Sequence, residues 1–72
     1  MTYDVGMVSR LTGVPRNTLI AWERRYGVVR PQRAANGYRM YTPAEVETLR
    51  RLKELVDHGH RVGQAAQVLR AD

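Results

Sequence analysis

The segment Gly13-Val14-Pro15 is a helix stop, and it constrains the fold of this chain more than any other segment does. A glycine can end a helix in the left-handed conformation, and a proline cannot continue that helix but can begin the next. Before the stop, Asp4 is predicted to cap a helix of about two turns whose inner face carries Val5, Val8 and Leu11. The stop therefore separates two short helices by a tight turn.

The second helix is predicted from about Arg16 to Tyr26, ending before Gly27. Its inner stripe is Leu19, Trp22 and Tyr26, and its opposite face presents Asn17, Ile20, Ala21 and Arg24. Two helices joined by a glycine-containing turn predict a helix-turn-helix at about residues 5–26. The same pattern also occurs in helical hairpins of other small bundles.

A β-hairpin is predicted next, at about residues 29–41. Asn36-Gly37 favours a type I′ turn, because both residues tolerate positive φ. Alternation beyond the turn predicts Arg39 and Tyr41 on one face and Tyr38 and Met40 on the other. We expect an aromatic face directed inward and arginines directed outward, as in the wing of a winged-helix protein.

Two further helices are predicted as scaffold, over about residues 43–58 and 62–71. Thr42, Pro43 and Glu45 form a capping-box pattern at the start of the first, which ends near Gly59. Glu47 and Arg51 are expected to pair on its exposed face. The fold class is mainly α with a small hairpin: about four helices and a two-stranded wing in a single domain, residues 1–72.

Positive charge is concentrated in the part of the chain that forms the helix-turn-helix and wing. The 72 residues contain 12 Lys and Arg against 7 Asp and Glu, a formal charge of +5. Residues 10–39 hold seven arginines and one acid, Glu23, whereas residues 40–72 hold five basic and five acidic residues. Arginine binds phosphates and guanine edges bidentately, so the distribution indicates a nucleic-acid partner.

Other classes of protein are disfavoured by the composition. There is no cysteine, so disulfides and thiolate metal sites are excluded, and His58, His60 and Asp57 are too few for a typical zinc site. No nucleophile–base pair or phosphate-binding glycine loop is identifiable, so no enzyme activity, metal or cofactor is expected. Without a membrane span or signal peptide, a cytoplasmic protein at the bacterial nucleoid is expected.

The order of these motifs resembles the DNA-binding domain of the MerR family over nearly the whole chain. Within that family it is most similar to the branch of the cobalamin- and light-linked repressors of carotenoid synthesis, CarA and CarH. The residues that carry the resemblance are Leu11-Thr12-Gly13-Val14, Thr18-Leu19, the run from Ala21 to Gly27, Asn36-Gly37-Tyr38-Arg39, Tyr41 and Thr42.

The resemblance implies that the second helix enters the major groove and the wing follows the DNA backbone. It implies base or phosphate contacts from Arg16, Asn17, Thr18 and Arg24, and phosphate contacts from Trp22, Arg25, Arg33, Tyr38 and Arg39. A core position for Trp22 is equally compatible with its place on the inner stripe. Ile20 departs from the family's frequent arginine, which affects site preference more than fold.

The resemblance also implies the partners. They are double-stranded operator DNA and an acidic antirepressor protein that competes with DNA for the same face. The isolated module is expected to be monomeric, with the intact regulator oligomerising through a further C-terminal region. An excisionase-like protein that bends DNA, or a basic module that binds only acidic proteins, remains an alternative. Salt-dependent binding to duplex DNA is expected of the operator-binding module and of the excisionase-like protein, but not of a module that binds only acidic proteins.

Overall fold

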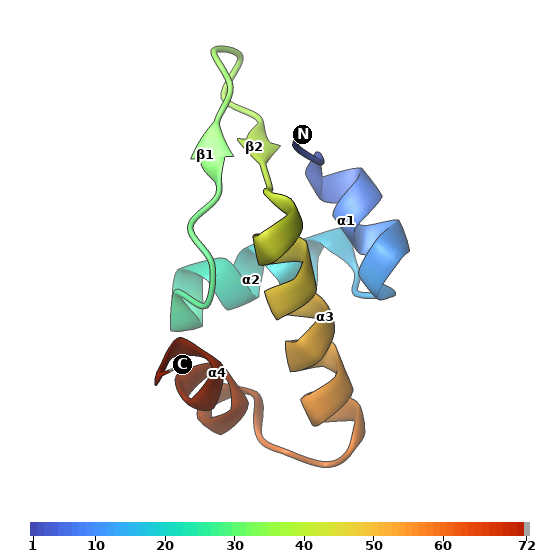
Figure 1. Cartoon of the computed structure of the whole chain (residues 1–72), viewed down its shortest axis with the longest axis vertical. Coiled ribbons are helices and arrows are strands. Elements are labelled where there is room, and N and C mark those ends of the chain that lie inside the picture. Colours follow the sequence, from blue (N-terminus) through green and yellow to red (C-terminus); the bar gives the residue numbers. More distant parts are fainter. Residues whose placement is uncertain (72) are drawn as a thin grey trace.

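The computed structural model describes residues 1–71 and has the predicted winged helix-turn-helix architecture (Figure 1). Along the chain lie α1 (Val5–Thr12), α2 (Arg16–Tyr26), β1 (Gln32–Arg33), β2 (Arg39–Met40), α3 (Pro43–Asp57) and α4 (Val62–Ala71). The hairpin projects from one end of the molecule, and α4 lies at the other end beside α2 and α3 (Figure 1). Each helix predicted from the sequence is present, with bounds that agree to within about one residue.

Helix α1 begins and ends at the predicted residues. The Asp4 side chain accepts a hydrogen bond from the Met7 amide at 2.8 Å, and Gly13 ends the helix with φ 76°. Helix α2 follows Pro15, has no side-chain N-cap, and ends at Gly27 with φ 58°. These two left-handed glycines fix the positions where the chain changes direction.

The predicted inner position of Leu11 is wrong, because its side chain is 56% exposed and Thr12 is buried instead. The Thr12 hydroxyl donates to the Val8 carbonyl at 2.7 Å and accepts from the Val14 amide at 3.2 Å. A buried hydroxyl with both bonds made carries little penalty. The inner face of α1 therefore follows residues 5, 8 and 12, and its polar member joins α1 to the turn.

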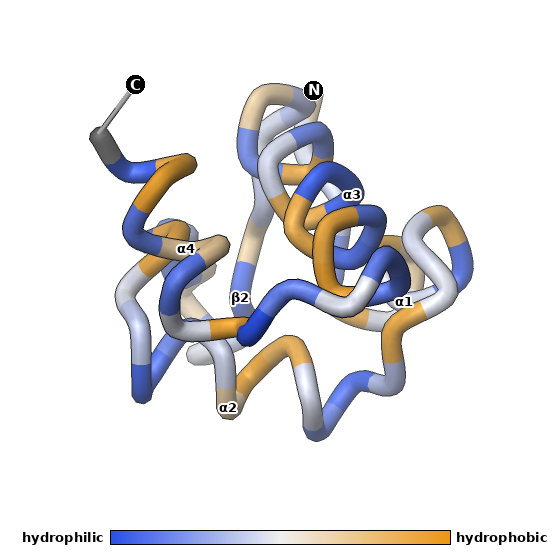
Figure 2. The backbone as a smooth tube through the Cα atoms, turned by 90° about the horizontal axis from the view of Figure 1, so that it is seen from below, coloured by the Kyte–Doolittle hydropathy of each residue, from blue (hydrophilic) through white to orange (hydrophobic). Residues whose placement is uncertain are grey.

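The core lies between α1, α2, α3 and the base of the hairpin. Its largest fully buried side chains are Tyr41, Leu19, Leu49, Leu52, Val8 and Val14. Helix α4 closes one side with Ala65 and Ala66, which are 3% and 1% exposed. Apolar and polar stretches alternate along the helices (Figure 2). No helix in residues 1–71 has the length and apolar character needed to cross a bilayer.

The hairpin is antiparallel, with Gln32 opposite Met40 and Arg33 opposite Arg39. Its turn is not the predicted type I′, because Gly37 at φ 86° is its only residue with positive φ. The Gly37 amide donates to the Ala34 carbonyl at 2.8 Å, which fits a three-residue loop in which the glycine follows the turn. The Asn36 side chain accepts from the Tyr38 amide at 3.1 Å, so asparagine acts here through its side chain.

The two faces of the hairpin also differ from the prediction that arginines point outward. Tyr38 is 69% exposed, whereas the side chain of Arg39 is only 12% exposed and Tyr41 is fully buried. Tyr41 exchanges two backbone hydrogen bonds of 2.8 Å with Tyr3, which ties the base of the hairpin to the start of the chain.

Helix α3 begins with the predicted capping box between Thr42 and Glu45. The expected Glu47–Arg51 pair is absent among the described residues. Arg50 instead pairs with Glu47 at 2.7 Å and with Glu54 at 3.2 Å, and Arg51 stays exposed. The charges on this helix therefore neutralise one another locally.

Candidate nucleic-acid interface

The outer side of α2 carries polar and basic side chains. Arg16, Asn17 and Arg24 are exposed, and Thr18 is half-buried on the same helix. Leu19 is 1% exposed and holds the opposite side of α2 in the core, so the helix is fixed in rotation. Because residues three and four apart share a helix face, Asn17, Ile20, Ala21 and Arg24 form one continuous strip.

Two other predicted contact residues lie toward the end of α2. Trp22 is half-buried and packs against the core, which matches its position on the inner stripe. Arg25 is exposed and lines a hollow of ≈ 450 Å³ between α2 and α4, together with Arg70 and Gln67. Arg70 also donates to the Tyr26 carbonyl at 3.2 Å, which ties α4 to the end of α2.

The hairpin adds two exposed side chains near its tip. Tyr38 is 69% exposed next to the loop, and the Arg33 guanidinium donates to the Gly37 carbonyl at 2.9 Å. That hydrogen bond holds the Arg33 side chain along the loop, where its remaining donors stay available. The hairpin tip therefore offers one aromatic and one cationic group.

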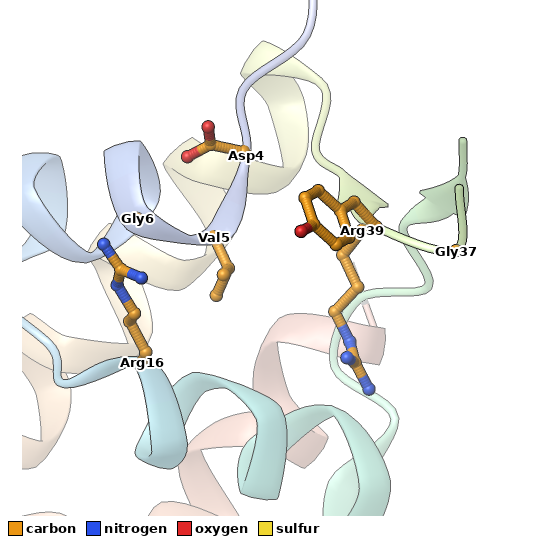
Figure 3. A pocket seen from close by; sticks show the side chains of 7 residues that line it. Asp4, Val5, Gly6, Arg16, Gly37 and Arg39 are labelled. Carbon is orange, nitrogen blue, oxygen red and sulfur yellow. The ribbon is translucent and has the colours of Figure 1, made fainter. Parts of the chain in front are cut away.

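A hollow of ≈ 360 Å³ separates the hairpin from the start of α1 and α2, and Arg16 and Arg39 are among its lining residues (Figure 3). The Arg16 side chain extends toward Gly6 in α1 (Figure 3). A Cβ atom on Gly6 would lie 2.6 Å from Arg16 Nη2, so the absent side chain makes room for the guanidinium. Gly6 thus provides the resting place for Arg16.

Arg39 extends from the hairpin toward α2 instead of toward solvent (Figure 3). Its Nε donates to Glu23 Oε1 at 2.6 Å, and the two side chains are 12% and 19% exposed. Burial raises the pKa of the nearby Tyr41 hydroxyl above 10.0, and the Glu23 carboxylate raises it further. Tyr41 therefore stays neutral, and Glu23 is the anion that Arg39 meets.

Every acidic side chain in residues 1–71 is engaged in a helix cap or an ion pair. Asp4 and Glu45 cap helices, Glu23 pairs with Arg39, and the remaining acids pair within α3. Among the described residues, the arginines with no acidic partner within 4.0 Å are Arg10, Arg16, Arg24, Arg25, Arg30, Arg33, Arg51, Arg61 and Arg70. Six of these nine belong to the basic segment that includes α2 and the hairpin.

The structure brings the predicted residues together on α2 and the hairpin, with Arg39 turned inward and Trp22 partly covered. Two residues of the candidate site were not predicted from the sequence. They are Glu23, which pairs with Arg39, and Gly6, which leaves room for the Arg16 side chain. As the single acid in a basic segment, Glu23 carried a signal, whereas Gly6 carried none. In residues 1–71, no group of three His, Asp or Glu side chains is placed to hold a metal ion.

Comparisons with known proteins agree on one family. A family model described as "MerR HTH family regulatory protein" matches residues 3–72. The HTH-type transcriptional repressor CarH of Myxococcus xanthus is 44% identical over 68 residues, which cover 94% of this chain and 23% of that protein. The repressor CarA of the same organism is 46% identical over 71 residues, covering 94% and 25%. The chain thus spans about a quarter of these relatives.

The fold agrees with a solved structure that contains DNA. HiNmlR, a MerR family regulator lacking the sensor domain and bound to promoter DNA, superposes with a TM-score of 0.85 at 21% identity. The match covers 99% of this chain and 54% of that one.

Proposed function

The chain belongs to the MerR HTH family of regulatory proteins, and from this premise we propose that it binds operator DNA in a sequence-specific way. Residues 1–72 act as the N-terminal DNA-binding module of a bacterial transcriptional regulator. Membership of this family makes the chain a regulator and not an enzyme, in agreement with the sequence prediction.

The observation that carries the proposal is the strip of side chains along α2 beside arginines without acidic partners. In the proposed complex α2 lies in the major groove, where Asn17 and Thr18 meet base edges. Asn17 pairs an amide with the edge of a base, the chemistry that asparagine uses to read adenine. Phosphate contacts from Arg16, Arg24, Arg25, Arg33 and Tyr38 fix the register of the helix on the duplex.

The proposal is tested by selecting bound duplexes from random DNA and titrating a selected duplex at several salt concentrations. The logarithm of affinity should fall with the logarithm of salt concentration, at about −0.9 per phosphate contacted. Binding to duplex DNA that is undetectable or insensitive to salt would contradict the proposal. The same titration separates it from a module that binds only acidic proteins.

Base reading is tested by replacing Asn17 with alanine. Selection with Asn17→Ala should return a different preferred sequence, with about 1–3 kcal/mol less discrimination at one base pair. Gln64→Ala removes an exposed amide from α4 and serves as the matched control, with an unchanged preference. If Asn17→Ala weakens all sequences equally, Asn17 binds the backbone and does not read a base.

Repression is proposed from the similarity to two proteins described as transcriptional repressors, CarH and CarA. Through the same arginines the module would bind an acidic antirepressor protein, since carboxylates present the charge that phosphates present. Such a protein should compete with the selected duplex, and simultaneous binding of both would contradict a shared face.

The proposed setting follows from the same family. The regulator acts in the cytoplasm at the bacterial nucleoid, and the module by itself is monomeric. The intact regulator oligomerises through a further C-terminal region. Sedimentation of the 72-residue chain at increasing concentration tests the monomer, and a concentration-dependent rise in mass would contradict it.

A further inference from the structure

One ion pair connects the hairpin to the helix that faces DNA in the proposed complex. Arg39 Nε lies 2.6 Å from Glu23 Oε1, and the residues are 16 positions apart. All other ion pairs among residues 1–71 are local to α3, three or four positions apart. Glu23–Arg39 is therefore the only ion pair between separate elements among residues 1–71.

The hairpin depends on such a link because its own strands are short. Each strand has two residues, and an isolated two-stranded hairpin is marginal in water. The Tyr3–Tyr41 bridge anchors its base, and the ion pair acts farther along, at the strand pair Arg33–Arg39. Two contacts at different positions along the hairpin fix its orientation, whereas the contact at its base alone would let the hairpin rotate.

The side-chain chemistry suits a link better than a contact with phosphate. Arg39 is 12% exposed and its Nε already donates to a carboxylate, so it offers little surface to DNA. Glu23 is the single acid in residues 10–39 and would repel phosphates unless it were paired. A partly buried pair also favours one arrangement, because separating it leaves a charge without a partner.

We propose that Glu23 and Arg39 are positioning residues that hold the hairpin at the angle at which its tip and α2 reach one DNA duplex together. This inference rests on the proposed DNA binding. Backbone contact then comes from the exposed Arg33 and Tyr38 at the hairpin tip, and Arg39 acts through the wing without touching DNA.

Glu23→Gln gives the decisive test, because charge and position predict opposite signs. Removing an acid from a DNA-facing region should tighten binding if only charge matters. If the pair positions the wing, Glu23→Gln should weaken binding to the selected duplex about tenfold, which is ~1.4 kcal/mol. Glu47→Gln changes the net charge equally but breaks an exposed pair within α3, so it is the matched control and should not weaken binding.

Arg39→Gln and the exchanged variant Glu23→Arg with Arg39→Glu complete the experiment. Arg39→Gln should weaken binding about as much as Glu23→Gln, with an unchanged salt slope, because no phosphate contact is lost. The exchanged pair should recover most of the loss. Circular dichroism is recorded for each variant, and the exchanged pair, which keeps an attractive link, provides the test if a single variant unfolds.

The outcomes separate this inference from the proposed function. If the wild-type protein shows no salt-dependent binding to any duplex, the proposed function fails. If the wild type binds but Glu23→Gln binds as tightly or more tightly, the positioning role is wrong while DNA binding stands. A salt slope that is shallower by about 0.9 in Arg39→Gln would instead make Arg39 a phosphate contact.

Discussion

Single residues explain where the sequence prediction succeeded and where it failed. Asp4 and Gly13 act as predicted because capping depends on neighbouring backbone atoms. Leu11 was misplaced because hydrophobicity favours burial, whereas Thr12 has two hydrogen bonds inside the turn that only the folded chain provides. Arg39 was misplaced for a related reason, since its partner Glu23 is distant in sequence.

Gly6→Ala should stabilise the protein by about 0.5–1 kcal/mol, because alanine is the better helix former. The new Cβ would meet the flexible end of Arg16, 2.6 Å from Nη2, and would lie 3.3 Å from Asp4 Oδ1, and the Arg16 guanidinium can move to solvent. Thermal unfolding measures the change, with Gly63→Ala in α4 as a second helical glycine for comparison. A loss above about 1 kcal/mol would mean that Arg16 is held firmly against α1.

Tyr41→Phe should change the free energy of unfolding by less than about 1 kcal/mol, because the buried hydroxyl has no hydrogen-bond partner among residues 1–71. It should also alter the response to alkali. The pKa of Tyr41 is raised in the folded state, so its contribution is fully present below pH 10.0 and is lost as pH rises through the folded pKa.

Urea unfolding across this pH range checks the expectation. Tyr41→Phe should keep more of its stability above pH 10.0 than the wild type does. Equal alkaline losses in the two proteins would mean that Tyr41 does not titrate differently on folding.

At the scale of elements, helix ends were predictable and the facing of the hairpin was not. Capping signals and glycines act over three or four residues, which a sequence displays directly. The hairpin was located correctly from Asn36-Gly37, but its loop has three residues, which pairs Arg33 with Arg39, and Arg39 turns inward to meet Glu23. A turn type predicted from two residues is therefore a weak guide to which residues of the two strands pair.

Thr42→Ala should destabilise the protein by about 1 kcal/mol, because α3 loses the hydroxyl that accepts from the Glu45 amide. Urea unfolding gives the value. Thr48→Ala is the matched control, since Thr48 lies inside α3 and its hydroxyl bonds only to the Ala44 carbonyl. Equal losses in the two variants would show that removing any threonine side chain from this helix has the same cost, and that capping adds nothing.

Over the whole molecule, charge divides between a basic surface and a neutral scaffold. The division was readable from the sequence because residues 10–39 hold seven arginines and one acid. Folding sharpens it, since the acids of α3 pair within their own helix and leave the arginines of α2 without acidic partners among residues 1–71. The sequence could not show that the single acid of the basic segment would join two elements.

Arg24→Ala should reduce the salt slope of binding to the selected duplex by about 0.9, because one phosphate contact is lost. Arg51→Ala removes the same charge from an exposed position on α3 and should leave the slope unchanged. Fluorescence anisotropy at several salt concentrations measures both slopes. Equal reductions would mean that the salt slope depends on the net charge of the protein and not on contacts made by α2.

The pairing of Tyr3 with Tyr41 closes nearly the first forty residues into a loop whose ends are joined by two hydrogen bonds of 2.8 Å. The helix-turn-helix and the hairpin both lie inside this loop, so opening of the Tyr3–Tyr41 pair frees the start of α1 and the base of the hairpin together. We therefore expect the amide protons of Tyr3 and Tyr41 to exchange with deuterium together, with similar protection from exchange. In this way the beginning of the chain holds the base of the hairpin and the start of α1 together.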